Sequence, residues 1–298
     1  IISQYFWPEN FRVNDLALGL NENGVNVTIL TAYPNYPNKE MYKNSKLNKY
    51  FNGMEIIRVP ILSRGSSKFS LFLNYLSFVF SGLFFGLTRL LNRKYDIVFV
   101  FQPSPITSII PAIFISKIKR AKLVIWVLDL WPDTLKPMGL LNNNSLNKFS
   151  FFLSNLIYKK TDLIFGQSES MSFLLKKRLP KNKIKFLPNW VEEELFKKNK
   201  YKKNKNSQSF KIYFAGNIGL AQDFDTIIKA IELIPKTERI QVCIIGDGKE
   251  KKRLMLQVQE KNLSELILFK NSVPLESVSE LLHQADALIL ALKKARNF

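Results

Sequence analysis

Apolar strands alternate with amphipathic helices along nearly the whole chain, and this alternation restricts the fold more than any other feature. It begins with a strand over 1–4, a helix over 13–20 with apolar residues at i, i+3, i+4 and i+7, and a strand over 25–31 after Gly24. Further strands are predicted at 54–59, 96–101, 122–128 and 162–167. Helices between strands act as crossovers, so a mostly parallel sheet is expected.

The pattern restarts after the basic run KKNKYKKNKNSQ at 197–208. The second series of strands is predicted in the runs KIYFAGNIG, IQVCIIGDG, LILFKNSV and ADALILAL, with helices in DTIIKAIELI and EKKRLMLQVQEKN between them. We therefore predict a first domain over 1–190, a Lys/Asn-rich linker over 191–209 and a second domain over 210–298. Two such α/β domains are expected to face a cleft that holds the active site.

Composition narrows the class of protein. The 298 residues are 46% hydrophobic, enough for a sizeable core, and the net charge of +20 favours anionic partners. Nucleic-acid binding is disfavoured, because only Tyr201 interrupts the basic runs with an aromatic ring. Cys243, the single cysteine, is expected to be a small core residue of a protein from a reducing cytoplasm. The chain lacks a starting Met and stops just after a strand-like run, so both ends are expected to be cut.

The segment 69–88, FSLFLNYLSFVFSGLFFGLT, has no charge and lies between Lys68 and Arg89. It is long enough to span a bilayer. A helix would gather its Ser, Asn and Thr residues into a weakly polar stripe beside a broad face of Phe and Leu, a pattern typical of an interfacial helix on an anionic membrane. The alternative is a helix packed on the sheet.

Polar residues and glycines follow several predicted strands. Asp129 ends the run in VIWVLDLWPD, where open α/β sheets place their ligands, although a carboxylate there also caps helices. Gly216 and Gly219 permit a tight turn whose backbone N–H groups meet a phosphate, and Gly246-Asp247-Gly248 repeats the pattern. Plain turns are the alternative for both. No P-loop lysine motif or GxGxxG is present in the sequence, which disfavours NTP hydrolysis and dinucleotide chemistry.

The ordered motifs YFWPENFRVNDLALGLNENGVNVTILT, VLDLWPD, GQSESMSFLL, LPNWVEEELF, YFAGNIGLAQDFDTIIKA, IIGDGKEKKRL and VPLESVSELLHQADALILAL cover most of the chain. Together they resemble family-4 retaining glycosyltransferases of the GT-B fold, and most closely the L-fucosamine transferase-like (WbuB-like) branch. The resemblance implies two facing Rossmann-like domains with parallel sheets. It places the acceptor site mostly in the first domain and a nucleotide-diphosphate sugar mainly in the second, which the cut leaves incomplete.

The resemblance also assigns residues of the first domain. It implies an acceptor and phosphate loop containing Glu9, Asn10 and Arg12, with Phe11 and Arg12 where the wider family has two glycines. Arg12 is expected either to contact phosphate or to face solvent in the first helical turn. Asp129 stands beside the transferred sugar and is the catalytic candidate, preceded here by Leu128 rather than His or Arg. Trp131 offers a flat face to a sugar or lipid, or else packs in the core.

In the second domain the resemblance implies a donor-binding set: Gly216, Asn217, Gly219, Gly246, Asp247, Gly248, Lys249, Val273 and Pro274. Asn217 and Gln222 stand where the wider family holds the pyrophosphate with Arg and Lys, so the neutralising charge is expected to come from elsewhere. Lys251, Lys252 and Arg253 are interpreted as surface residues, and His283 as structural. Asp223 and Asp225 are interpreted as helix-capping residues rather than metal ligands. The paired glutamates of the family's donor segment would lie beyond Phe298.

The expected reaction is retaining transfer of a hexosyl or N-acetylhexosaminyl group from a nucleotide-sugar, with UDP favoured, to a lipid-linked or polysaccharide acceptor in bacterial cell-surface polysaccharide synthesis. No metal or other cofactor is implied. The expected location is the cytoplasm, peripheral on the inner face of the plasma membrane. Two alternatives stay open: a non-catalytic membrane-associated partner of a polysaccharide assembly complex, and a sugar-nucleotide epimerase of the same architecture.

Overall fold

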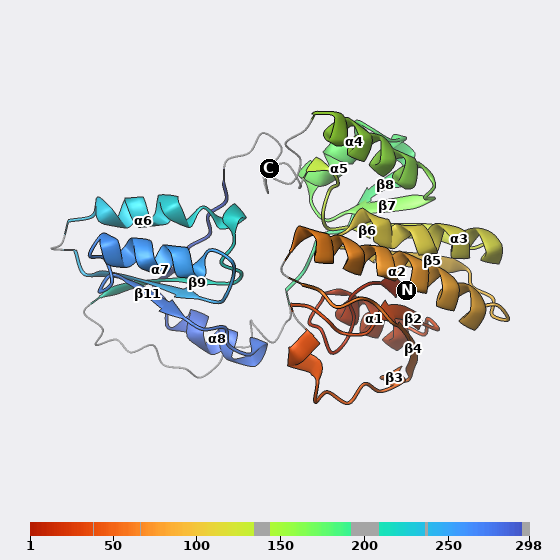
Figure 1. Cartoon of the computed structure of the whole chain (residues 1–298), viewed down its shortest axis with the longest axis horizontal. Helices are drawn as coiled ribbons and strands as arrows, with labels where there is room; N and C mark the ends of the chain where they lie inside the picture. The colour runs from red at the N-terminus through yellow and green to blue at the C-terminus, as the bar shows by residue number, and fades with distance from the viewer. Residues whose placement is uncertain (38, 66, 134–143, 192–208, 236–237, 294–298) are drawn as a thin grey trace. The chain divides into compact units, whose positions relative to one another are not determined.

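The computed structural model describes residues 1–298 except 38, 66, 134–143, 192–208, 236–237 and 294–298 (Figure 1). The chain divides into two compact units, Ile1–Trp190 and Val191–Phe298. Nearly all of the predicted linker, 191–209, lies outside the described residues. Each unit is an α/β layer structure with its own sheet, as the alternation of strands and helices predicts.

The first unit is built on an eight-stranded sheet of order β3-β4-β2-β1-β5-β6-β7-β8. All neighbours are parallel except β3, which is antiparallel to β4. The strands are β1 (Ile2–Ser3), β2 (Thr28–Ala32), β3 (Tyr50–Phe51), β4 (Met54–Val59), β5 (Ile97–Gln102), β6 (Lys122–Val127), β7 (Leu163–Gly166) and β8 (Ile184–Phe186). Five of the six residues of β6 are buried, since helices or loops cover both faces of a parallel sheet.

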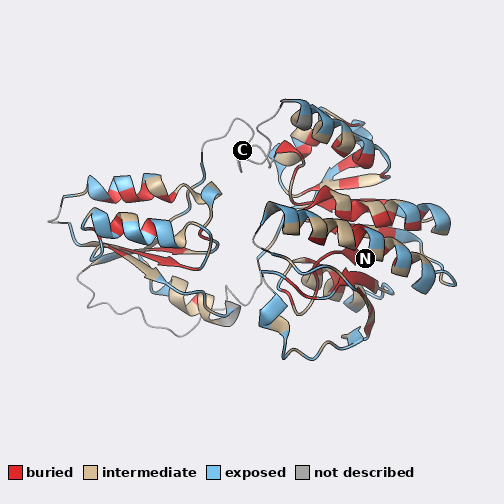
Figure 2. Cartoon of the chain, viewed as in Figure 1, coloured by how far each residue is buried: buried red, intermediate tan, exposed pale blue. Residues whose placement is uncertain are grey.

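Two apolar clusters divide the helices of the first unit between the faces of its sheet. These helices are α1 (Val13–Glu22), α2 (Lys68–Arg89), α3 (Ile110–Lys119), α4 (Asn144–Lys159) and α5 (Glu169–Lys176). Phe78, Ile115, Ile157 and Leu175, one from each of α2 to α5, belong to a single cluster. Val13 and Ala17 of α1 belong to the other, with Trp126. The buried residues of Figure 2 accordingly line the inner sides of α2 to α5.

Helix α2 reverses the expected orientation of its polar stripe. Asn74 is fully buried and donates to the Leu62 carbonyl at 2.6 Å. Ser77 accepts from the Leu62 N–H at 2.9 Å, and Ser81 donates to the Pro60 carbonyl. The polar stripe therefore faces the protein rather than a headgroup region, because the loop after β4 presents backbone groups that need partners. Packing of α2 on the sheet, the alternative interpretation, is what the structure shows.

The opposite side of α2 carries exposed aromatic rings. Phe69, Phe72, Phe80 and Phe84 are each between 57% and 69% exposed. Residues Phe69–Arg89 are long and apolar enough to cross a membrane by length and composition alone, and only 28% of the most apolar window is buried. A span is unnecessary to explain this helix, since its other side already packs in the core.

The second unit has a four-stranded parallel sheet of order β11-β10-β9-β12. Its strands are β9 (Phe210–Ala215), β10 (Ile240–Ile245), β11 (Ile267–Lys270) and β12 (Ala287–Leu288), and its helices are α6 (Phe224–Glu232), α7 (Lys251–Glu260) and α8 (Leu275–His283). Ile228 of α6 and Leu254 of α7 share one core cluster. Leu281 of α8 packs in another cluster with Cys243, which is 1% exposed and confirms the prediction of a small core residue.

Candidate functional site

The loops at the carboxyl edge of the first sheet are held together by buried polar side chains. The side chain of Gln4, just after β1, donates to the side-chain oxygen of Asn74 at 2.9 Å, and the Asn74 side chain donates to that of Asn35, after β2, at 3.2 Å. All three residues are at most 2% exposed. Within the described residues, the side-chain oxygen of Gln4 is buried with no hydrogen-bond partner. These contacts hold the loops after β1 and β2 against α2, and the predicted acceptor residues lie on the first of these loops.

Glu9 joins two of these loops. One of its oxygens accepts hydrogen bonds from the Asn35 and Tyr36 N–H groups at 2.8 and 2.7 Å, and the other accepts from the Phe6 N–H at 3.3 Å. Burial raises the pKa of Glu9 to about 7, although these backbone donors favour the ionised form. Both oxygens of the carboxylate thus bind backbone N–H groups. This structural role differs from the contact with acceptor or phosphate that the resemblance implies.

The other two predicted residues of this loop differ from Glu9. Asn10 is exposed. Arg12 occupies the N-cap position of α1 and pairs with Asp15 at 2.9 Å, with 22% of its side chain exposed. Phe11, which stands in place of a family glycine, stacks on Tyr5 with ring centroids 4.8 Å apart. An aromatic residue at this position therefore anchors the loop.

A cluster of Arg64 and three tyrosines at this edge was not predicted from the sequence. Its guanidinium lies 5.1 Å from the centre of the Tyr36 ring and 5.9 Å from that of Tyr75, and donates to the Tyr5 hydroxyl at 3.0 Å. These residues come from four separate segments of the chain, so no local pattern could reveal them. They add one half-buried cation to the carboxyl edge.

Asp129 follows β6 directly, as the sequence predicts, and differs from Glu9 in having no partner. Within the described residues, no hydrogen bond or ion pair reaches its carboxylate. Burial raises its pKa to about 6, the only cause of the shift. No described N–H is capped by it, and 134–143 lies outside the described residues. A half-buried carboxylate without compensation is typical of a site that a ligand completes.

Two side chains that follow Asp129 after β6, those of Trp131 and Asp133, have partners. Trp131 donates from its indole N–H to the Ser104 hydroxyl at 3.2 Å and packs against the core. Asp133 pairs with Arg178, whose guanidinium also lies 4.2 Å from the centre of the Phe151 ring. Both side chains of this ion pair are nearly buried. Asp133 therefore stabilises the fold, and Asp129 alone of the two carboxylates stays available for chemistry.

In the second unit, the glycine turns after β9 and β10 pack backbone against backbone. A Cβ atom on Gly246 would lie 1.9 Å from the Gly216 carbonyl oxygen, and one on Gly248 would lie 2.1 Å from that of Ile218. Gly246 also has a φ of +146°, which L-residues with side chains rarely adopt. The close approach of the turns thus explains Gly246 and Gly248, whereas the sequence suggested only phosphate binding or plain turns.

Several backbone N–H groups of these turns already have partners. The N–H of Gly216 donates to Ile245 at 3.0 Å, that of Ile218 to Asp247 at 2.8 Å, and that of Gly219 to the Gln222 side chain at 3.2 Å. Asn217 is exposed and, in the part of the chain that the structure describes, its N–H has no such bond. Within the turn after β9, the N–H of Asn217 is therefore the group left for the predicted phosphate contact.

The basic residues after the second turn have unequal freedom. Lys251 donates to the Gly246 and Lys270 carbonyls and to the Asn271 side chain, at 2.9 to 3.1 Å, and so ties β10 to β11. Lys249 is exposed and forms no hydrogen bond or ion pair with any described residue. Of the predicted donor residues, Lys249 is thus the cation left available to a ligand. Asp247 is exposed, Val273 is half-buried, and Pro274 is the exposed N-cap residue of α8.

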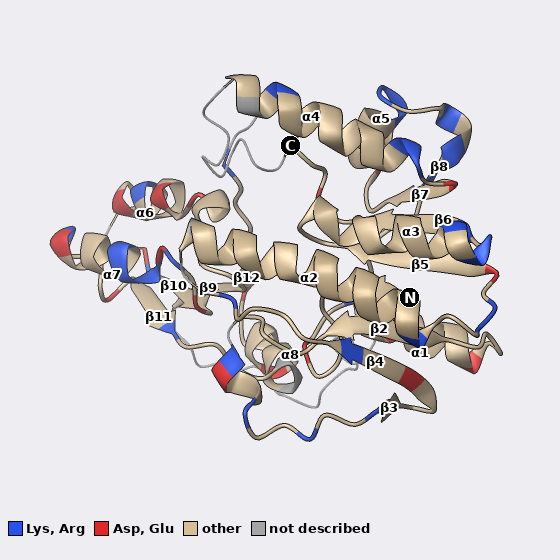
Figure 3. Cartoon of the chain, turned by 45° about the vertical axis from the view of Figure 1, so that its right-hand side comes forward, with Lys and Arg blue, Asp and Glu red and all other residues tan. Residues whose placement is uncertain are grey.

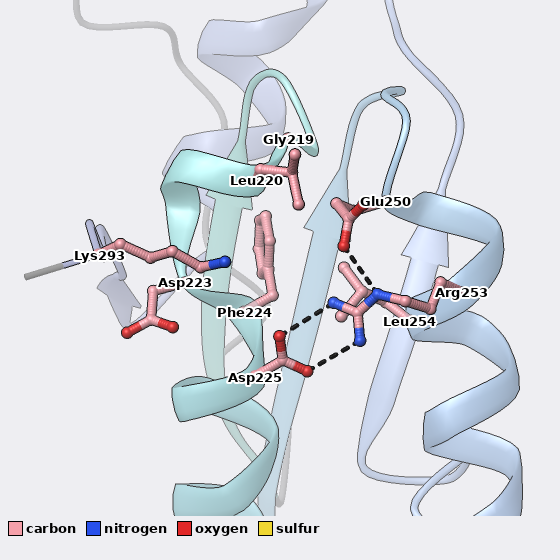
Figure 4. A pocket seen from close by; sticks show the side chains of 9 residues that line it. All are labelled: Gly219, Leu220, Asp223, Phe224, Asp225, Glu250, Arg253, Leu254 and Lys293. Carbon is pink, nitrogen blue, oxygen red and sulfur yellow. Dashed lines mark hydrogen bonds and ion pairs between the residues drawn. The ribbon is translucent and has the colours of Figure 1, made fainter. Parts of the chain in front are cut away.

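Arg253 lies in a shallow pocket between α6 and α7, shown in Figure 4. It forms a two-pronged ion pair with Asp225, at 2.9 and 3.0 Å, and a third bond to Glu250 at 2.7 Å. These carboxylates neutralise it. Asp223 is the N-cap residue of α6 and Asp225 lies in its first turn, as expected for residues at a helix start. The Asp223 side chain accepts from the Thr226 hydroxyl at 2.8 Å rather than from a backbone N–H, so it forms no capping hydrogen bond. Among the described residues, no group of three His, Cys, Asp or Glu side chains is placed to hold a metal ion.

Comparisons with known proteins agree with this architecture. Residues 10–195 match the profile of Glycosyltransferase Family 4, and residues 196–295 match that of Glycosyl transferases group 1. No curated protein matches the sequence.

Similar solved structures include HepE of Anabaena in complex with UDP and glucose, at 13% identity and a TM-score of 0.64 over 100% of this chain and 76% of that one. Sucrose-phosphate synthase of Thermosynechococcus elongatus aligns at 14% identity and a TM-score of 0.67, over 97% and 71% of the two chains. WaaG, a glycosyltransferase involved in lipopolysaccharide biosynthesis, aligns at 14% identity and 0.63, over 99% and 74%. At these identities the likeness shows the fold, which is GT-B.

Proposed function

This chain belongs to glycosyltransferase family 4, and we propose that it transfers a hexosyl or N-acetylhexosaminyl group from a UDP-linked sugar to a hydroxyl acceptor with retention of configuration. Family membership supports the transferase, and the UDP complex of HepE supports the donor. Asp129 is the observation that carries the proposal. A half-buried carboxylate without a partner among the described residues costs free energy, so its presence at the carboxyl edge is explained best by a ligand that donates to it.

In the proposed reaction, a bond forms between the acceptor oxygen and the anomeric carbon while the bond from that carbon to the UDP oxygen breaks. The acceptor proton passes to the departing diphosphate. Asp129 is mostly ionised above pH 7 and accepts a hydrogen bond from a hydroxyl, which orients it for transfer. Lys249 and the Asn217 N–H meet the charge that grows on the diphosphate.

Donor binding and transfer are tested with the purified chain and a panel of UDP-sugars. We expect at least one of them to raise the melting temperature and to release UDP when an acceptor is present. Asp129→Asn should lower kcat about a hundredfold with little loss of donor affinity, within the range known for lost positioning and charge. Asp96→Asn removes an exposed carboxylate and serves as the matched control.

The same assay separates the alternatives. Labelled sugar on the acceptor supports transfer, and the anomeric signals of the product test retention. Sugar that changes configuration while still attached to UDP would indicate an epimerase. A chain that no UDP-sugar stabilises would contradict the enzyme and favour a non-catalytic role in an assembly complex.

For the acceptor, we propose a lipid-linked saccharide reached from a membrane surface. Helices α2, α3 and α4 contain no Asp or Glu, and Figure 3 shows them as long uncharged ribbons with basic residues toward their ends. Their exposed apolar side chains are Phe69, Phe72, Phe80 and Phe84 of α2, Phe114 and Ile118 of α3, and Phe149, Phe152 and Leu156 of α4. We call this set the aromatic face.

The aromatic face combines apolar surface with positive charge, the chemistry that suits an anionic bilayer. This supports peripheral attachment to a membrane. We further propose that the attachment is at the inner face of the plasma membrane, that the process is lipopolysaccharide or capsule synthesis, and that the chain belongs to the L-fucosamine transferase-like branch. Binding to vesicles of phosphatidylcholine with phosphatidylglycerol should exceed binding to phosphatidylcholine alone. The double change Phe80→Ser and Phe84→Ser should weaken it about tenfold or more.

Leu233→Ser provides the control for this test, because Leu233 is 84% exposed in the second unit and lies outside the aromatic face. Equal weakening by Leu233→Ser and by the double change would contradict attachment through the aromatic face. Transfer to a water-soluble acceptor would remain measurable in either case, so attachment and catalysis are tested separately.

A further inference from the structure

A cavity of about 590 Å³ opens beside β4 in the first unit, apart from the residues assigned above to the transfer reaction. Strand β3 pairs with β4 at Met54 and Glu55, and no other described strand lies along the rest of that edge. Its lining includes four cations and one carboxylate, Lys49, Arg58, Arg89, Arg93 and Glu55, together with the ring of Phe85.

The cations of this cavity are only partly neutralised. Glu55 pairs with Arg93 and lies 3.8 Å from the Lys49 ammonium. Arg89 forms no hydrogen bond or ion pair with a described residue. The four cations and one carboxylate leave an excess of three positive charges. Such an excess in a concave site attracts an anion.

Arg58 links the cavity to the loop after β1. It donates to the Asn48 carbonyl at 2.6 Å and to the Trp7 carbonyl at 2.9 Å. Its Nε is buried without a hydrogen-bond partner among the described residues. The positive charge of this half-buried guanidinium on the cavity wall is stabilised when an anion enters beside it.

The cavity also borders the aromatic face. Phe85 lines it, whereas the adjacent Phe84 is 63% exposed on the aromatic face, and the two ring centroids lie 5.2 Å apart. A molecule with a phosphate group and a hydrocarbon tail can therefore contact both surfaces at once. A free phosphate uses only the first.

We propose that this cavity binds the phosphate group of a membrane lipid, with the hydrocarbon part lying over Phe84 on α2. The inference rests on the proposed attachment of the aromatic face to a membrane. It adds a specific headgroup site to an attachment that otherwise depends on apolar area and summed charge.

The test measures binding of dihexanoyl phosphatidylglycerol, below its micelle concentration, to the full chain by calorimetry. Inorganic pyrophosphate and dihexanoyl phosphatidylcholine form the comparison arms. Arg89→Gln should weaken binding of the anionic lipid about fivefold, the effect of one cation near a phosphate. Glu55→Gln should strengthen it by a similar factor, because it removes the carboxylate that competes for the same cations.

Lys117→Gln is the matched control, since it removes an exposed cation at the end of α3 that does not line the cavity. Equal weakening by Arg89→Gln and Lys117→Gln, or no gain from Glu55→Gln, would overturn the site. Pyrophosphate bound as tightly as the lipid, and weakened equally by Arg89→Gln, would overturn the assignment to an amphiphile, because that binding depends on the cavity rather than on the diphosphate site of the second unit. Because the measurement contains no donor sugar, a failure of the proposed sugar transfer would not change its result. If the chain binds anionic vesicles but Arg89→Gln and Lys117→Gln bind them equally well, the lipid site in the cavity is rejected and attachment through the aromatic face is kept.

Discussion

The carboxyl edges of the two sheets are built from different chemical groups. In the first unit, side chains such as Glu9, Asn35 and Asn74 fill the edge and bind the loops to one another. In the second unit, two glycine turns meet through their backbones, and Gly246 sits against the Gly216 carbonyl. A side-chain edge can be varied residue by residue, whereas a backbone edge has no room for any side chain at its contact.

The largest effect is expected where the backbone edge is filled. Gly246→Ala places a methyl group 1.9 Å from a carbonyl oxygen at a φ that disfavours alanine, so the second unit should lose about 3 kcal/mol or more of its free energy of unfolding. Urea unfolding followed by circular dichroism measures it. Gly24→Ala, at a φ of +81° with nothing within 4 Å, should cost only about 1 kcal/mol. Equal costs would mean that the two turns do not touch.

At the carboxyl edge of the first sheet, substitution of Glu9 should destabilise the fold nearly as much. Glu9→Ala removes the acceptor of three backbone N–H groups, two of them in buried hydrogen bonds, and we expect a loss of about 2 to 3 kcal/mol in the free energy of unfolding. Glu9→Gln keeps an oxygen for Asn35 and Tyr36 and should restore most of it. Glu22→Ala, at an exposed position of α1, is the control. A neutral Glu9→Ala would contradict the role of Glu9 in joining the loops.

Replacing Asp129 should stabilise the fold, whereas replacing Glu9 should destabilise it. Its folded pKa of about 6 lies above the ordinary 3.8, so the folded chain holds the proton more tightly and its stability falls as pH rises from about 4 to about 6. Asp129→Asn removes this penalty and should raise the free energy of unfolding by about 1 to 2 kcal/mol at pH 8, with no gain at pH 3.5. Thermal unfolding at the two pH values measures it, and a pH-independent gain would contradict the burial argument.

The smallest effects are expected from Arg253 and Lys249 of the second unit, and they should differ in kind. Arg253→Gln breaks a partly exposed ion pair with Asp225 and should cost only about 0.5 to 1 kcal/mol. Because Arg253 is already neutralised, UDP affinity should stay the same. Lys249→Gln should lower UDP affinity about fivefold without loss of stability, the effect of one charge-assisted contact. Calorimetric titration with UDP that gave the reverse ranking would refute this division of roles.

The strands were predictable where burial leaves a continuous apolar run. The run predicted at 122–128 is β6 within one residue, and 54–59 is β4. Strands β3 and β8 escaped prediction because they are two and three residues long and mostly exposed, so they lack an apolar pattern. For α2, periodicity indicated which residues share a side. It does not indicate which side faces inward, and the backbone groups at Pro60 and Leu62 decide that.

The candidate site was predictable only where a local signature exists. Asp129 and the glycines follow apolar strands, so their place at the carboxyl edges could be read from neighbouring residues. The contact of Gly246 with Gly216 joins residues thirty positions apart, and the bond from Gln4 to Asn74 spans seventy. Such contacts depend on the folded sheet rather than on any pattern in the chain. Arg64 was missed for the same reason.

The contact between the turns after β9 and β10 also limits how relatives of this protein can be recombined. A chimera whose crossover lies between Gly219 and Ile240 would take one turn from each parent and place together two loops that were never fitted to each other. We expect such hybrids to be insoluble unless both turns come from the same parent. Crossover points are therefore better placed outside the stretch from Phe210 to Lys251, so that both glycine turns come from the same parent.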